Sequence, residues 1–154
     1  MHVSAKADYA VRALVELTAR SAEQPGYVTV EQLAACQQLP VKFLETIFTE
    51  LRKDGVVISR RGVDGGYRLA RDPGEITVAD IIRAVDGPLA AVRGLRPEDT
   101  QYGGAATAMP QLWVALRAAV RGVLEGVSLA DLVSGELPTD VSALTSSAAA
   151  WHRR

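Results

Sequence analysis

Apolar residues recur three and four positions apart between Val41 and Lys53, which is the spacing of one face of an α-helix. Polar residues fall on the opposite face, so one side of the predicted helix packs and the other is exposed. Gly55 follows and supplies the left-handed conformation in which helices commonly end. The apolar positions are Phe43, Leu44, Ile47, Phe48 and Leu51, and the polar ones are Lys42, Glu45, Thr46, Thr49, Glu50 and Lys53.

Two short runs with strand character follow this helix, at 56–60 and 67–70. The segment between them contains Gly62, Gly65 and Gly66, which tolerate positive φ, so a β-hairpin is the simplest prediction. These glycines are turn residues that also permit close approach of a phosphate to the backbone. A helix followed by a basic hairpin is the arrangement of a winged helix, and this hairpin carries Arg60, Arg61 and Arg68.

Two further helices are predicted before residue 40. Ser4 is a suitable N-cap for a helix reaching about Ser21, and Thr29 opens a capping box for a short helix that ends near Leu39. Pro40 fits the first turn of the next helix, where its missing N–H needs no partner. Two helices joined by a tight turn form a helix-turn-helix, whose second helix enters the major groove of DNA N-terminus first. The residues placed nearest base edges are Pro40, Val41, Lys42, Glu45 and Thr46.

The predicted DNA-binding surface joins the exposed helix face to the wing. Surface arginines are usually only solvated, and the functional alternative is that the wing arginines enter the minor groove or neutralise phosphates. The full predicted set is Thr29, Pro40, Val41, Lys42, Glu45, Thr46, Lys53, Ser59, Arg60, Arg61, Gly62, Gly65, Gly66, Tyr67 and Arg68.

The rest of the chain alternates helical and irregular segments. Thr77 is expected to start a helix that closes at Gly87, and large apolar residues at helical spacing predict a long helix over 110–125. That long helix is either part of the core or a contact with a partner chain. The predicted protein is therefore mainly α, with a winged helix-turn-helix domain (three helices plus a β-hairpin wing) over 1–88, a flexible loop over 89–107, a long and a short helix over 108–135, and a disordered tail over 136–154.

Composition narrows the class of protein. The chain has 154 residues, 48% of them hydrophobic, which suits one small domain with accessory elements. The net charge is only −1, but residues 1–71 hold ten Lys and Arg against eight Asp and Glu. Local basic patches rather than the total charge make a phosphate footprint. No membrane-spanning run and no secretory signal are visible, so a cytoplasmic location is expected.

The sequence offers no catalytic or metal-binding constellation. His2 and His152 lie at opposite ends of the chain, and Cys36 is the single cysteine. Neither a Ser/His/Asp or Cys/His arrangement nor a zinc-ligand spacing is present. We therefore expect neither an enzyme nor a bound cofactor or metal.

Several motifs together resemble a known family. The segments 4–14, 43–45, 51–57, 59–71 and 76–88 are similar, in this order, to the Rrf2 family of bacterial winged-helix transcription regulators, which includes the IscR, NsrR and CymR types. The resemblance covers roughly residues 1–134. It implies a homodimeric DNA-binding regulator whose long helix crosses its twin, through Met109, Leu112, Trp113, Leu116, Val120, Val123 and Leu124.

One departure from the family concerns its iron–sulfur members, which carry three cysteines in the region of 89–109. This chain has none there. Asp8 stands where some members are suspected to use a carboxylate ligand, but Asp8 and Cys36 cannot hold a cluster, which needs several thiolates or imidazoles. The signal stays open among a small ligand, oxidation of Cys36, a protein partner as in CymR-type members, and no signal at all.

Three functions compete. The first is a transcriptional repressor that binds double-stranded DNA as a homodimer on an inverted-repeat operator. The second is a winged helix that binds another protein, which the acidic Glu45 and Glu50 on the exposed helix face favour. The third is a small-molecule enzyme, for which only fold analogy speaks.

Overall fold

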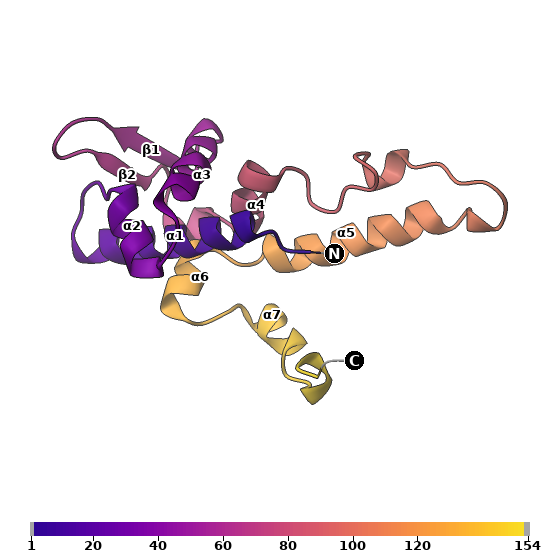
Figure 1. Ribbon diagram of the computed structural model, residues 1–154. Helices are drawn as coiled ribbons and strands as arrows, with labels where there is room; N and C mark the ends of the chain where they lie inside the picture. Colours follow the sequence, from indigo (N-terminus) through magenta and orange to yellow (C-terminus); the bar gives the residue numbers. More distant parts are fainter. Residues whose placement is uncertain (1, 153–154) are drawn as a thin grey trace.

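The computed structural model describes residues 2–152 and is mainly helical, with one antiparallel hairpin (Figure 1). The expected winged helix-turn-helix arrangement is confirmed. The helices are α1 (Ala5–Glu23), α2 (Val30–Gln37), α3 (Val41–Lys53), α4 (Val78–Asp86), α5 (Met109–Leu124), α6 (Leu129–Ser134) and α7 (Thr139–Leu144). The strands are β1 (Val57–Arg60) and β2 (Gly66–Leu69), and the 3₁₀ turns are η1 (Pro73–Glu75), η2 (Pro97–Asp99), η3 (Gly104–Ala106) and η4 (Ala148–Ala150).

Side-chain caps fix where the helices begin. The Ser4 hydroxyl accepts a hydrogen bond from the backbone N–H of Ala7, and Thr29 and Gln32 form the expected capping box at α2. Thr77 at α4 and Ser128 at α6 do the same with an Asp three residues later. Each cap satisfies backbone N–H groups that have no partner inside the helix. The residues close to each helix start therefore determine where that helix begins.

The core is built around α1, which contacts α2, α3, α4 and α6. Its buried stripe of Ala10, Leu14 and Leu17 has no exposed surface. Helix α3 contributes the expected apolar face with one exception: Phe43 is 39% exposed and packs edge-to-face with Tyr9, with ring centroids 5.7 Å apart. Phe43 precedes the buried stripe by one position, and this turns its side chain toward the margin of the packed face.

The wing is anchored to the domain by backbone pairing. In the hairpin Val57 pairs with Leu69 and Arg60 with Gly66. Val28 forms an isolated antiparallel β-bridge with Tyr67 of β2, in which its N–H and C=O exchange hydrogen bonds of 2.9 and 2.8 Å with the Tyr67 backbone. The Tyr67 ring also packs against Phe48 of α3, with centroids 4.8 Å apart. The wing is therefore held against α3.

Helix α5 extends away from this body, and the segment between α4 and α5 runs beside it (Figure 1). None of the residues of α5 is fully buried. The loop expected to be flexible contains η2 and η3 and buries Pro97 and Thr100. Two contacts tie it to α5: the Trp113 indole N–H donates to the Tyr102 hydroxyl at 3.0 Å, and Arg117 pairs with Glu98 at 2.6 Å.

The described part of the tail also differs from expectation. Disorder was predicted over 136–154, whereas residues 139–144 form α7 and residues 148–150 form η4. Val141 is only 7% exposed. The apolar residues Leu137, Val141 and Leu144 recur four and three positions apart, and this spacing outweighs the Ser, Thr and Ala content of the segment. Residues 153–154 lie outside the described part.

Across residues 2–152, the helices are all too short or too polar to cross a bilayer.

Candidate nucleic-acid interface

The start of α3 is set by the turn after α2. Gln38 adopts the left-handed conformation, with φ of 53°, and ends α2. Leu39 is buried and its N–H donates to Ala34 at 2.9 Å, which turns the chain sharply. Pro40 is the N-cap rather than the first helical residue, with φ of −66°. This tight turn aims the N-terminus of α3 outward.

The polar face of α3 is open to solvent. Val41, Lys42, Glu45 and Thr46 are all exposed, together with Pro40 before them. The Thr46 hydroxyl donates to the backbone carbonyl of Lys42 at 3.3 Å, so it stays close to the helix surface. Lys53 is exposed at the other end of α3. The residues predicted to reach base edges are therefore all exposed, on α3 and at its N-cap.

A groove of about 380 Å³ lies between the start of α2, the face of α3 and the wing. It brings nine of the predicted residues together and adds three that sequence reasoning did not single out. Pro40, Val41, Lys42, Thr46, Lys53 and Arg68 are outside it. The predicted members are Thr29, Glu45, Ser59, Arg60, Arg61, Gly62, Gly65, Gly66 and Tyr67, and the additional ones are Val30, Glu31 and Arg52.

The wing arginines are organised around an aromatic ring. The Tyr27 ring lies 4.8 Å from the Arg60 guanidinium and 5.3 Å from that of Arg68, within the range of cation–π attraction. Arg60 also donates to the backbone carbonyl of Asp64 at 2.8 Å. Tyr27 was missed because it lies in a break between helices, far along the chain from the wing. Its role depends on the Val28–Tyr67 pairing, which no local pattern predicts.

Arg52 is a second residue that the sequence did not single out. Its guanidinium donates to the Ser59 hydroxyl at 3.3 Å and so bridges the last turn of α3 to the wing. Only the packing of the hairpin against α3 brings Arg52 and Ser59 together. The bridge holds a further positive charge beside the groove.

Two of the wing glycines have a structural role. A side chain at Gly66 would put its Cβ 2.5 Å from the Val28 carbonyl oxygen, and one at Gly65 would come equally close to the Arg60 carbonyl oxygen. The close approach expected for a phosphate is made at these two positions by the chain's own backbone. Gly62 differs, because its φ is 103° and nothing lies within 4 Å of the added Cβ. Gly62 therefore faces open space, and its positive φ is the reason that a glycine stands there.

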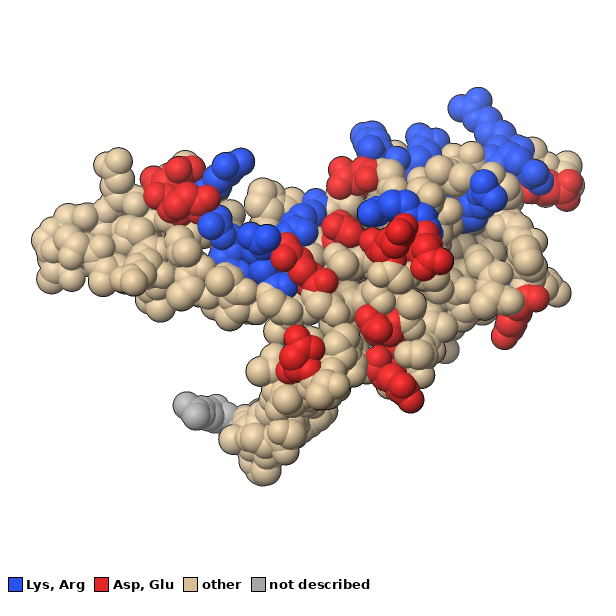
Figure 2. Space-filling view, turned by 180° about the vertical axis from the view of Figure 1, so that it is seen from behind, with Lys and Arg blue, Asp and Glu red and all other residues tan. Residues whose placement is uncertain are grey.

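Figure 2 shows the charges on the face seen from behind, where both signs occur and Lys and Arg are prominent over the wing. Glu50, which favoured a protein-binding function, pairs with Lys6 at 2.7 Å. That pairing balances one negative charge in the α3 region and leaves Glu45 as an exposed acid on the polar face of α3. The lower part, formed by α6 and α7, shows only acidic groups in this view. The wing side is thus the face suited to phosphates.

Residues 3–135 match a family model described as "Rrf2: Iron-dependent Transcriptional regulator". The described residues of this chain do not fit an iron centre, because no group of three or more His, Cys, Asp and Glu side chains is gathered within residues 2–152. Cys36 is exposed on α2, and its Sγ accepts from Arg20 at 2.7 Å. One thiolate per chain does not supply the ligand set of a cluster.

We expect the protein purified without oxygen to be colourless and to contain no stoichiometric iron, because its donor set is too small. Anaerobic absorbance spectra together with iron and sulfide assays test this expectation. Charge-transfer bands with iron and sulfide near one cluster per chain would contradict it.

Comparisons with known proteins agree on one family. A provisionally assigned HTH-type transcriptional regulator of Mycobacterium tuberculosis is 49% identical over 144 residues, covering 94% of this chain and 88% of that protein. The structure of CymR of Bacillus subtilis, described as the global cysteine regulator, matches with a TM-score of 0.73 at 32% identity, covering 88% of this chain and 98% of that one. The structure of IscR of T. potens matches with a TM-score of 0.69 at 30% identity, covering 99% of this chain and 97% of that one. These relatives are regulators rather than enzymes, and the chain belongs to the Rrf2 family of transcriptional regulators.

Proposed function

We propose that the protein is a cytoplasmic transcriptional repressor that binds an inverted-repeat operator in double-stranded DNA as a homodimer. The observation that carries the proposal is the open face of α3 beside the basic wing, with the groove between them. Helix α3 has the exposed N-terminal turn that major-groove recognition needs. A dimer bound over a promoter blocks access of the polymerase, which is the simplest way for such a protein to act.

Each part of the interface takes a separate task. Lys42, Glu45 and Thr46 face the base edges, where Glu45 accepts a hydrogen bond from a cytosine amino group. Arg60 and Arg61 reach phosphates or the minor groove, and they carry no sequence information when they contact phosphates. Thr29, at the start of α2, lines the groove and contacts the DNA backbone there.

Dimerisation through α5 is supported by apolar surface left open on that helix. Leu112 is 54% exposed and Leu116 is 38% exposed. They lie on one face with Val120 and Val123, and the irregular segment covers the side that carries Trp113 and Arg117. An extended apolar stripe of this kind marks a protein contact. A twin helix crossing there pairs large side chains from both copies.

Base discrimination should reside in Glu45 and Thr46. Replacing either by Ala removes a contact worth about 1–3 kcal/mol of preference for the cognate base, while affinity for random DNA changes little. Competition with randomised sites measures this change in preference. Lys53→Ala, at the far end of α3, is the matched control and should affect all sequences alike. Unchanged preference in both Glu45→Ala and Thr46→Ala would contradict the assigned reading face.

A gel shift separates the repressor from the protein-binding alternative. The probe is the DNA upstream of the protein's own gene, with unlabelled random DNA in excess. A repressor gives a shifted band that survives the competitor. A shift that the competitor removes completely, at every upstream fragment tested, favours a winged helix that binds another protein.

A further inference from the structure

A second hollow lies far from the DNA-reading face, between α4, α5 and the segment that joins them. Its volume is about 490 Å³, within the range of sites for small molecules. One wall is α5, another is the end of α4, and the rim is a tight turn in which Val92 and Leu95 exchange backbone hydrogen bonds of 3.0 Å. Arg93 and Gly94 have φ of 52° and 77°, which makes this a narrow hairpin turn. Arg96 directly follows this Val92–Leu95 turn and lines the hollow.

The lining of this hollow is rich in arginine, and three of its four arginines are paired with carboxylates. Arg83, Arg96, Arg117 and Arg121 line it, against Glu98 as the only acid. Arg117 pairs with Glu98 at 2.6 Å. Within residues 2–152, Arg96 takes part in no ion pair. Arginines arranged around one hollow are the groups that bind carboxylates and phosphates in a bidentate manner.

The remaining wall is apolar, with Leu89, Leu95 and Pro97 among the lining residues. An inorganic ion such as phosphate would make no apolar contact with this wall, whereas an organic anion would cover it. We propose that the hollow binds a small organic anion, a carboxylate or phosphate ester with an apolar portion, and that this ligand is the effector of the protein. The binding site follows from the geometry of the hollow, whereas the role of its ligand as an effector rests on the proposed function.

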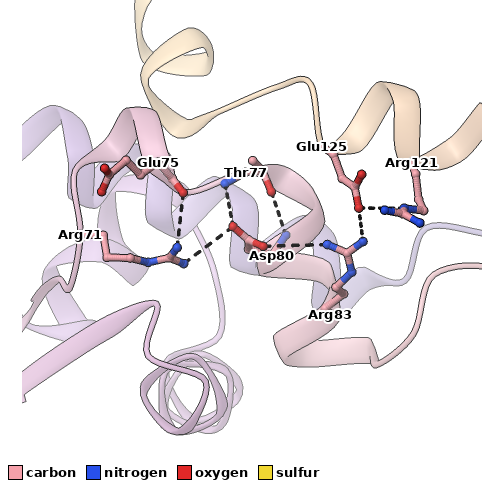
Figure 3. A network of polar contacts seen from close by, with 7 residues as sticks. All are labelled: Arg71, Glu75, Thr77, Asp80, Arg83, Arg121 and Glu125. Atoms are coloured by element: carbon pink, nitrogen blue, oxygen red, sulfur yellow. Dashed lines mark hydrogen bonds and ion pairs between the residues drawn. The ribbon is translucent and has the colours of Figure 1, made fainter.

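An ionic chain connects this site to the end of the wing (Figure 3). Glu125, just after α5, accepts hydrogen bonds from both Arg83 and Arg121. These bonds lower the pKa of the Glu125 carboxyl below its ordinary value, and the bond from Arg121 has the larger effect. Arg83 also lies 3.9 Å from Asp80, which in turn lies 3.7 Å from Arg71, two residues after β2. A ligand anion beside Arg83 and Arg121 competes with Glu125 for them. The competition loosens α5 from α4 and so couples the dimer helix to the wing.

Calorimetric titration without DNA tests the site itself. The probes are phenylacetate and phenyl phosphate, with 2-phenylacetamide as the uncharged counterpart of phenylacetate. We expect at least one anion to bind saturably and the amide to bind roughly tenfold more weakly or not at all. The stronger of the two anions identifies the ligand as a carboxylate or a phosphate ester. Arg96→Gln and Arg117→Gln should each weaken that anion roughly tenfold.

Arg93→Gln is the control, because it lies on the same turn but its guanidinium stacks over Tyr102, 5.3 Å from the ring centroid. It should bind the anion like the wild type. Absence of saturable binding of either anion, equal binding of the amide, or unchanged binding in Arg96→Gln with Arg117→Gln combined would overturn the site. Circular dichroism of each variant shows whether it folds.

Operator binding with and without the stronger anion tests the effector role. The wild type should change its operator affinity when the anion is added, and Arg96→Gln should not. An anion that binds in the calorimeter but leaves operator affinity unchanged overturns the effector role and keeps the site. A protein that binds no operator at all refutes the proposed function instead, and the calorimetric result still decides the site.

Discussion

Leu116→Glu should convert the protein to a monomer and lower its operator affinity to the level of non-specific DNA, a loss of roughly 10³-fold or more. Leu116 lies in the middle of the exposed apolar stripe of α5. Burial of one such side chain contributes about 1.5–3 kcal/mol, and a two-fold interface buries it twice. A buried carboxylate without a partner costs more still. Val120→Glu, on the same stripe, should behave alike.

Ala118→Glu is the matched control for this substitution. Ala118 is exposed two residues further along α5, which turns it to the opposite face of the helix. Its added charge should leave both the dimer and operator affinity intact. Analytical ultracentrifugation gives the oligomeric state, and fluorescence anisotropy gives the affinity. A wild type that sediments as a monomer at micromolar concentration, or a Leu116→Glu variant with full affinity for a palindromic site, places this helix in the core of one subunit instead.

The second large effect is expected at the wing. The double variant Arg60→Ala with Arg61→Ala should weaken DNA binding on the order of 10²-fold, because each substitution removes charge-assisted hydrogen bonds. In a dimer every substitution removes two positive charges. The slope of log affinity against log salt should therefore fall by about two units per substituted arginine that contacts a phosphate.

Lysine at the same two positions separates charge from shape. Arg60→Lys with Arg61→Lys keeps the charge, so the salt slope should stay near that of the wild type, while any contact in the minor groove weakens. Titrations at several salt concentrations measure both quantities. If the alanine variant binds a native operator as the wild type does at all salt concentrations, the wing does not contact DNA.

Local features of the fold were predictable because local chemistry determines them. The caps at Ser4, Thr29, Thr77 and Ser128 each depend on residues three positions apart, and the α3 stripe, found buried except for Phe43, depends on spacing within one helix. The hairpin followed from glycines between two short runs. Such features require no knowledge of distant segments, so a single sequence is sufficient to find them.

The remaining features depend on contacts between distant segments. Tyr27 stands beside the wing arginines only because Val28 pairs with Tyr67, and Gly66 is needed because the Val28 carbonyl fills the space of a side chain. The course of residues 89–107 along α5 has the same origin, since Arg117 and Glu98 meet there. In the tail, the high Ser, Thr and Ala content predicted disorder, but the helical spacing around Val141 lets this side chain be buried, and residues 139–144 form a helix.

The stoichiometry and spacing of the protein on a selected site test the proposed mode of action most directly. Duplexes selected from random DNA are sequenced, and the complex on the best of them is analysed by sedimentation. Two recognition helices related by a two-fold axis require half-sites about 34 Å apart or a multiple of that distance. We predict an inverted repeat with this spacing and two chains per duplex, or a multiple of two. Selection of no consensus, or a single chain bound to an asymmetric site, would contradict a dimeric winged-helix repressor.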